Sequence, residues 1–235
     1  MVISGLQKMT LLDFPGKVAC TVFLQGCNFR CPFCHNTDLL PPEGQAFMTE
    51  DALIAFLQKR TGLLDGVCIT GGEPTLYQDL PELLRRIKEL GYAIKLDTNG
   101  FKPDVLQALV EENLIDYVAV DAKNAPARYG QTVGVPGFKL DKIEQTIRYL
   151  MEDHVAYELR TTVVEPLHDE ASILEMGKWL SSLTPGKKPA KLFLQSFVDR
   201  DTVAFGGLCA ASSDTMAYYV KLLEPYVGEV SLRGT

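Results

Sequence analysis

The chain has 235 residues, of which 46% are hydrophobic and 23% charged, and its net charge is −7. That composition is typical of a globular protein long enough to bury its own core. The acidic balance disfavours nucleic acid as a partner, because phosphate binding needs clustered lysine and arginine. No apolar run approaches the ~18 residues of a membrane span, and the N-terminus lacks a signal-peptide pattern, so we expect a cytoplasmic protein that binds no membrane.

Short apolar runs alternate with amphipathic segments along most of the chain. The runs have the length and composition of strands buried on both faces of a sheet. They lie at 18–24, 67–70, 93–98, 117–121, 157–164 and 192–197, and a last strand is expected at 227–232. The opening segment before residue 18 and the segment 41–48 are interpreted as irregular loops that could reach a partner.

The amphipathic segments predict helices after these strands. We expect them at 49–59, 80–90, 103–111, 141–151, 170–183 and 213–223, with possible capping boxes at Asp79–Glu82 and Asp141–Glu144. Six strand–helix units imply an α/β fold with a parallel sheet and right-handed crossovers. Periodicity allows a closed barrel, a partial barrel or a doubly wound sheet, and each gathers function at the carboxyl ends of the strands.

Three of the six cysteines crowd into one loop, QGCNFRCPFCHN, directly after the first predicted strand. Three residues separate Cys27 from Cys31, and two separate Cys31 from Cys34. A loop with this spacing can turn three thiolates toward one centre. A four-iron cluster normally takes four thiolates, so three would leave one iron open to a small ligand.

Other interpretations of the cysteines stay open at this point. They could be buried structural residues, or zinc ligands completed by His35. An electron-transfer cluster would need a fourth cysteine from Cys20, Cys68 or Cys209. Cys20 and Cys68 fall inside predicted strands, which favours small buried apolar residues.

Polar residues follow the next three strands in the strings TGGEPT (70–75), LDTNG (96–100) and VDAK (120–123). Glycines let a backbone approach a ligand closely, and a carboxylate can bind an ammonium group. Oxygen-rich pockets suit a hard cation, and lysine suits a carboxylate. Ordinary turns and an ion pair between Asp121 and Lys123 are the alternatives.

Two residues near the fifth strand have competing interpretations. Arg160 lies inside the strand, where an unpaired arginine is costly, so it could serve a ligand carboxylate or pair with Glu158. His168 follows the strand in a loop, and the residue type favours a solvated histidine there.

The loop CxxxCxFC, with Phe33 before the last cysteine, resembles the signature of the radical S-adenosylmethionine (SAM) superfamily. The continuation Cys34-His35-Asn36 is similar to its glycyl-radical-enzyme activating branch, and the whole pattern resembles activating proteins of anaerobic ribonucleoside-triphosphate reductase. The resemblance implies a partial (β/α)6 TIM-like barrel. It covers a core of about residues 18–200 in a single domain of residues 1–235.

The resemblance also implies cofactors and their ligands. Cys27, Cys31 and Cys34 would hold one [4Fe-4S] cluster, whose open iron binds SAM. Phe33 would lie near the adenine, and Gly71, Gly72 and Glu73 would meet the SAM amino group. Lys123 would contact the SAM carboxylate. The string containing Asn99 matches the family, and a monovalent cation could lie near Asp97, Thr98 and Asp121.

By the same resemblance, the substrate is a glycine in a partner glycyl radical enzyme, and the partner is an anaerobic ribonucleotide reductase. The electron donor would be a flavodoxin or ferredoxin. Two alternatives remain. One is a radical SAM reaction on a small molecule, as in deazaguanine synthases, and the other is a non-catalytic iron–sulfur protein for electron transfer or scaffolding. Cys68 is the only cysteine between His35 and Thr70. The sequence therefore lacks the cysteines for a further cluster there, and we expect a single cluster.

Overall fold

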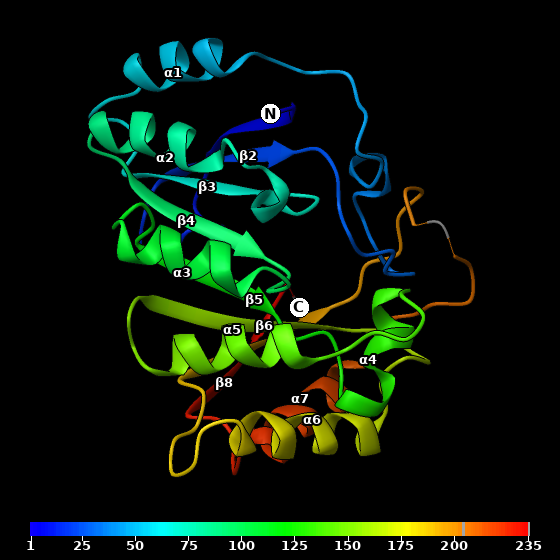
Figure 1. Cartoon of the computed structure of the whole chain (residues 1–235). Coiled ribbons are helices and arrows are strands. Elements are labelled where there is room, and N and C mark those ends of the chain that lie inside the picture. Colours follow the sequence, from blue (N-terminus) through cyan, green and yellow to red (C-terminus); the bar gives the residue numbers. More distant parts are fainter. Residues whose placement is uncertain (204, 235) are drawn as a thin grey trace. The chain divides into compact units, whose positions relative to one another are not determined.

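In a computed structural model of the chain, residues 1–203 and 205–234 are described. They form an α/β structure (Figure 1). The described chain divides into two compact units. The first unit comprises Met1–Asn28 and Asp38–Ala119, and the second comprises Phe29–Thr37 and Val120–Thr235. The cysteine loop is therefore built into the second unit from Phe29 onward, although its chain neighbours belong to the first.

The first unit is a mostly parallel sheet with helical crossovers. Strand β1 (Ile3–Thr10) pairs with β2 (Ala19–Leu24) in antiparallel orientation. Parallel pairing then joins β2 to β3 (Gly66–Gly71) and β3 to β4 (Ala93–Thr98). The helices of this unit are α1 (Glu50–Gln58), α2 (Leu80–Glu89) and α3 (Pro103–Glu111). Short 3-10 turns occur at Thr37–Leu39 and Pro74–Leu76.

The second unit is also built on parallel strands. Strand β6 (Ala156–Val163) pairs with β7 (Lys191–Ser196), which pairs with β8 (Glu229–Arg233). Strand β5 (Tyr117–Asp121) begins in the first unit and ends in the second. The helices are α4 (Pro126–Val133), α5 (Asp141–Met151), α6 (Glu170–Ser182) and α7 (Ser213–Leu223).

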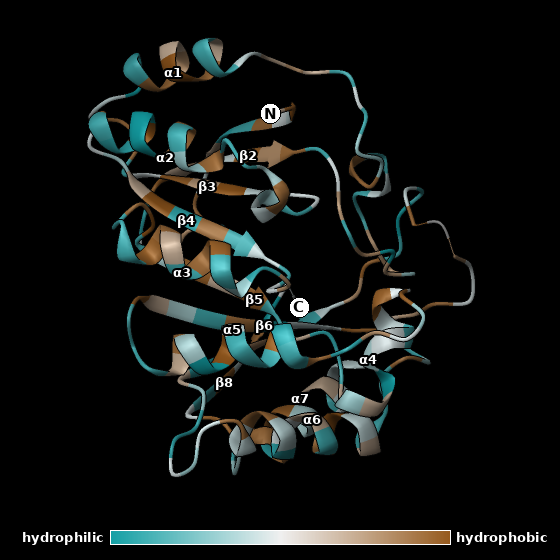
Figure 2. Ribbon diagram, in the orientation of Figure 1, coloured by the Kyte–Doolittle hydropathy of each residue, from teal (hydrophilic) through white to brown (hydrophobic). Residues whose placement is uncertain are grey.

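Residue patterns explain these elements. Strand β3 is apolar and buried over most of its length, and it appears hydrophobic in Figure 2. Helix α2 buries Leu80, Leu83, Leu84 and Ile87 on one face, as its apolar spacing predicts. Side chains of Thr49, Asp169 and Ser212 cap the starts of α1, α6 and α7.

The predicted α/β class with parallel strands is confirmed. The six predicted parallel strands match within one residue at each end, and the last strand starts two residues later than expected. The capping boxes at Asp79 and Asp141 were wrong. Asp79 precedes α2 without a cap hydrogen bond, and Asp141 is already helical.

Two elements were not predicted. The opening segment contains β1 rather than only a loop, because its backbone pairs with β2. Helix α4 follows β5 where no helix was expected. Within the described residues, no helix is long and apolar enough to cross a membrane. The single domain with a core at 18–200 stays a prediction.

Candidate active site

The stem of the cysteine loop is closed by the returning chain within the first unit. The Gly26 N–H donates to the Leu39 carbonyl at 2.7 Å, and the Cys27 N–H donates to the Leu40 carbonyl at 3.2 Å. The buried Gln25 amide donates to the carbonyls of Asp38 and Pro41. These bonds fix the chain where it enters and leaves the loop.

The rest of the loop is anchored inside the second unit. The Arg30 N–H donates to the Val133 carbonyl at the end of α4, at 2.9 Å. The Cys34 N–H donates to the Cys31 carbonyl at 3.1 Å, which forms a tight turn between two cysteines. Phe33 is only 5% exposed and packs in an apolar cluster with Val164, Leu167 and Phe197, against which Cys31 also packs.

The predicted site glycines lie against the loop stem. A side chain at Gly71 would place its Cβ 2.3 Å from backbone atoms of Leu24, and one at Gly72 would lie 2.0 Å from the Gly26 carbonyl oxygen. The Glu73 N–H also donates to that carbonyl at 2.8 Å. Both glycines are therefore required by the close approach of two strand ends, a reason the sequence interpretation did not include.

Glu73 links the ends of β3 and β4 and is 0% exposed. Its Oε1 accepts hydrogen bonds from the Thr75 N–H, the Thr75 hydroxyl and the Thr98 hydroxyl at 3.1, 2.5 and 2.7 Å. Its Oε2 accepts from the Asn99 N–H at 2.7 Å. Burial raises the pKa of Glu73, although these hydrogen bonds oppose the change.

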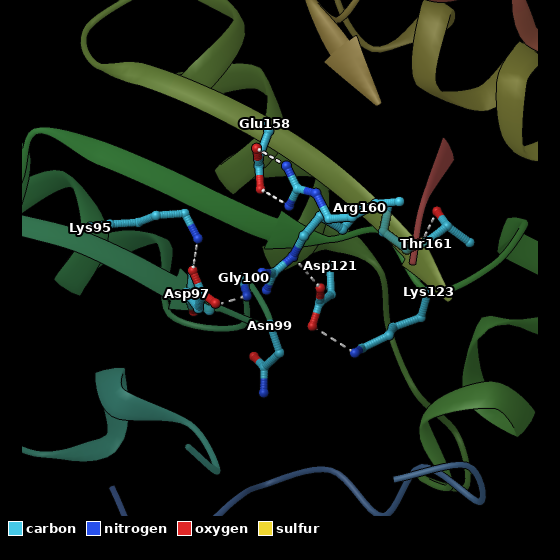
Figure 3. A network of polar contacts seen from close by, with 12 residues as sticks. Lys95, Asp97, Asn99, Gly100, Asp121, Lys123, Glu158, Arg160 and Thr161 are labelled. Carbon is cyan, nitrogen blue, oxygen red and sulfur yellow. Dashed lines mark hydrogen bonds and ion pairs between the residues drawn. The ribbon is translucent and has the colours of Figure 1, made fainter. Parts of the chain in front are cut away.

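The end of β4 also reaches the start of the cysteine loop. The Asn99 side chain donates to the Asn28 side-chain oxygen at 2.8 Å and accepts from the Phe101 N–H at 3.0 Å. Asp97 forms an ion pair with Lys95, which is fully buried (Figure 3). The predicted residues Glu73, Thr98 and Asn99 thus form one network.

A second network, in the second unit, joins Asp121, Lys123 and Arg160 (Figure 3). The Lys123 ammonium donates to Asp121 Oδ2 at 2.8 Å, and Arg160 Nε donates to Oδ1 at 3.1 Å. Burial alone would raise the pKa of Asp121, but the two cations outweigh it and hold this pKa at about 2. Two positive charges thus contact the Asp121 carboxylate.

The charge of Lys123 also acts on the cysteine loop. Its ammonium lies 5.8 Å from the centre of the Phe33 ring. Burial disfavours the charged lysine, but the negative charges of Asp121 and Cys31 outweigh it and raise the pKa of Lys123. The ion pair considered as an alternative for Asp121 is present. Arg160 pairs with Asp121 at 3.1 Å, and Glu158 pairs with Arg233 at 2.7 Å.

The sequence matches the radical SAM superfamily over residues 21–179. The chain belongs to this superfamily. A Methanocaldococcus jannaschii protein named "putative glycyl-radical enzyme activating enzyme" is 32% identical over 98% of this chain and 95% of its own length. The pyruvate formate-lyase-activating enzyme of Clostridium pasteurianum is 32% identical over 52% of each chain.

Solved structures agree on the fold. A radical SAM methyltransferase from Sphaerobacter thermophilus has a TM-score of 0.72 and 15% identity, and the match covers 97% of this chain and 68% of the methyltransferase. The protein is therefore a radical SAM enzyme with the α/β fold of that superfamily. Membership implies an iron–sulfur cluster and SAM as cofactors.

The loop offers a donor set that fits a radical SAM cluster. Cys27, Cys31 and Cys34 are each partly exposed, and none forms a disulfide within the described chain. In residues 1–203 and 205–234, no three His, Cys, Asp or Glu side chains gather as closely as ligands of one metal ion do. A four-iron cluster holds each thiolate on a different iron. The cysteine ligand set stays a prediction that rests on spacing, exposure and family.

The remaining cysteines and His168 have structural surroundings. Cys20 and Cys68 are fully buried, as predicted, and burial raises the pKa of Cys20 to about 12. Cys209 is exposed. His168 is buried rather than solvated, because its ring accepts from the Val164 N–H and donates to the Lys123 carbonyl at 2.8 Å. The contact between His168 and the Lys123 carbonyl could not be predicted from the residues that surround His168 in the sequence.

Proposed function

We propose that this radical SAM enzyme activates a glycyl radical enzyme. The observation that carries the proposal is the similarity to the Methanocaldococcus jannaschii protein, which extends over nearly the whole of both chains. A match of that extent leaves little of either protein outside the shared sequence. The cofactors of the proposed reaction are one [4Fe-4S] cluster and SAM.

When bound, these cofactors would supply reductive cleavage of SAM to methionine and a 5′-deoxyadenosyl radical, which can take a hydrogen atom from a glycine Cα. The chain's task is to bind and orient them and to exclude water. In the proposal, the thiolates of Cys27, Cys31 and Cys34 hold the cluster. Phe33, which is buried in an apolar cluster of the second unit, is proposed to lie near the adenine.

The polar networks supply the proposed SAM contacts. The positive charges of Lys123 and Arg160 suit the SAM carboxylate. Glu73 accepts one hydrogen bond at Oε2 and three at Oε1, so Oε2 is the oxygen proposed to meet the SAM ammonium. A monovalent cation near Asp97, Thr98 and Asp121 remains part of the proposal.

We further propose an anaerobic ribonucleotide reductase as the partner and a flavodoxin or ferredoxin as the electron donor. The test combines the reconstituted enzyme, a chemical reductant, SAM and a purified reductase under anaerobic conditions. A glycyl doublet in the electron paramagnetic resonance spectrum of the reductase is expected. If 5′-deoxyadenosine forms but no candidate partner gains the doublet, a small-molecule substrate replaces the proposed one.

The cysteine assignment is tested by two variants of the same chemical change. Cys31→Ala should lose both the cluster and SAM cleavage, because a ligand thiolate is missing. Cys209→Ala should retain both, because Cys209 lies outside the loop. Iron and sulfide counts and 5′-deoxyadenosine yield measure the two outcomes. Full cleavage by Cys31→Ala, or loss of the cluster in Cys209→Ala, would refute the ligand set.

A further inference from the structure

Three consecutive backbone carbonyls at the end of β5 each accept a hydrogen bond from a buried side chain. Two of these carbonyls lie beyond the last residue of the strand. Polar backbone groups in folded proteins are almost always paired, so the three bonds fix the backbone where it leaves the sheet. The donors and acceptors are Tyr129 and Asp121 at 3.2 Å, Thr161 and Ala122 at 2.7 Å, and His168 and Lys123 at 2.8 Å.

His168 connects the backbone after β5 with the backbone after β6. Its Nδ1 accepts from the Val164 N–H at 3.1 Å, and its own N–H donates to the Val164 carbonyl at 2.8 Å. The Lys123 carbonyl can only accept, so the proton of the neutral ring is on Nε2. Burial lowers the pKa of His168, which favours this neutral form. Both ring nitrogens therefore bind backbone groups, one from each segment.

A second bridge between the same two segments comes from Asn124, which is fully buried. Its side-chain amide donates to the Leu167 carbonyl at 3.0 Å. Val164 and Leu167 also pack with Phe33 of the cysteine loop in one apolar cluster. The segment after β6 therefore contacts both the cysteine loop and the backbone of Lys123.

The Lys123 ammonium projects from this fixed backbone. It donates to Asp121 Oδ2 at 2.8 Å (Figure 3). We propose that His168 is a positioning residue for SAM binding: by holding the Lys123 carbonyl, it fixes the backbone from which the Lys123 ammonium reaches the SAM carboxylate. This inference rests on the proposed function, which assigns that carboxylate to Lys123. A backbone that is fixed before SAM arrives lowers the ordering cost of binding.

The test compares the affinities of SAM and decarboxylated SAM for the cluster-loaded protein. Anaerobic calorimetry measures them, with iron content as a check on loading. Decarboxylated SAM keeps the amino group and the nucleoside but has no carboxylate for Lys123. His168→Asn keeps an acceptor at the same bond count from Cβ as Nδ1 but loses the donor to Lys123. It should bind SAM about tenfold more weakly, and decarboxylated SAM as the unaltered protein does.

Further variants separate the bond to Lys123 from the burial of the ring. His168→Gln places an amide N–H at the same bond count from Cβ as Nε2, so it should recover most of the SAM affinity. His154→Asn makes the same change as His168→Asn at an exposed histidine and should leave both affinities unchanged. In a Lys123→Met protein, His168→Asn should cause no further loss of SAM affinity, because the two residues act through one contact.

Equal losses for the two ligands in His168→Asn would show a purely structural role and overturn the inference. Unchanged SAM affinity in that variant, or a loss that adds to that of Lys123→Met, would also overturn it. Failure of the unaltered, cluster-loaded protein to bind SAM would instead remove the proposed function. If His168→Asn does not fold, His168→Phe replaces it, because its ring fills the same space without a donor. The same selective loss is expected there, and equal losses would again overturn the inference.

Discussion

Glu73 and Asp121, two carboxylates that lie at the ends of strands, have opposite electrostatic surroundings. Glu73 accepts hydrogen bonds from hydroxyl and backbone N–H groups, and burial raises its pKa. Asp121 contacts Lys123 and Arg160, and its pKa is lowered to about 2. The first residue joins two strand ends, and the second holds two cations in place.

The lowered pKa of Asp121 predicts a pH-dependent contribution to stability. Its ionised form is favoured by folding, so the contribution is complete above the ordinary pKa of 3.8 and is lost as the pH falls toward 2. Asp121→Asn removes this contribution and takes the carboxylate away from Lys123 and Arg160. We expect a loss of about 3 kcal/mol in the free energy of unfolding at neutral pH. Urea titrations from pH 7 to pH 3 measure the difference.

Asp51→Asn serves as the control, because Asp51 also pairs with an arginine, Arg86, but is 87% exposed. Its loss should stay below about 1 kcal/mol. The difference in the free energy of unfolding between the unaltered protein and Asp121→Asn should become smaller below pH 3.8. A gap that stays constant down to pH 3 would show that Asp121 acts through packing and not through its charge.

At the scale of elements, helix α4 positions the cysteine loop through its last turn. Gly134 ends the helix with φ +66°, and a Cβ there would lie 2.1 Å from the Arg30 carbonyl oxygen. The neighbouring Gly137 has the same φ of +66° with open space around it. The two glycines therefore share a backbone conformation but differ in what a side chain would meet.

Alanine substitutions at these two glycines distinguish the cost of backbone strain from the cost of displacing the cysteine loop. Gly137→Ala should cost about 1 kcal/mol of stability through strain alone. Gly134→Ala should cost more, and it should also lower the iron bound per chain, because Arg30 and the loop must move. Urea titration and iron analysis of both variants test this. Equal iron content in the two proteins would mean that α4 does not position the cluster loop.

The elements also differ in how well the sequence predicts them. Buried parallel strands such as β3 are continuous apolar runs, so their positions could be read directly. Strand β1 is half exposed and contains Gly5, and α4 has eight residues with Gly130 inside, so neither has a strong period. The loop cysteines could be proposed from spacing. The support from Gln25 and Asn28 could not, because their partners are distant in sequence.

At the scale of the whole molecule, the path of the chain ties the cysteine loop to the second unit. Phe29–Thr37 is inserted into that unit from a region of the chain that otherwise belongs to the first. The single tryptophan, Trp179, lies on α6 in the same unit and donates to Glu144 at 3.0 Å. Its fluorescence therefore reports on the part of the structure that anchors Cys31 and Cys34.

We expect this unit to lose its structure and its cluster together. In an anaerobic denaturant titration of the holoenzyme, Trp179 fluorescence and the visible absorption of the cluster should change at the same midpoint. The reason is that the loop's anchors at Val133 and in the Phe33 cluster belong to the same packed unit. Bleaching at a clearly lower denaturant concentration would mean that the loop opens by itself.

The unequal burial of the six cysteines makes the protein suited to thiol-specific labelling. Cys20 and Cys68 are inaccessible in the folded chain, whereas Cys209 is on the surface. With the three loop thiols occupied, an alkylating reagent would attach once, at Cys209, and each molecule without its cluster would take up to three more adducts. An intact-mass spectrum would then count the loaded fraction of a preparation, and Cys209 would provide a single attachment point for a fluorophore or spin label.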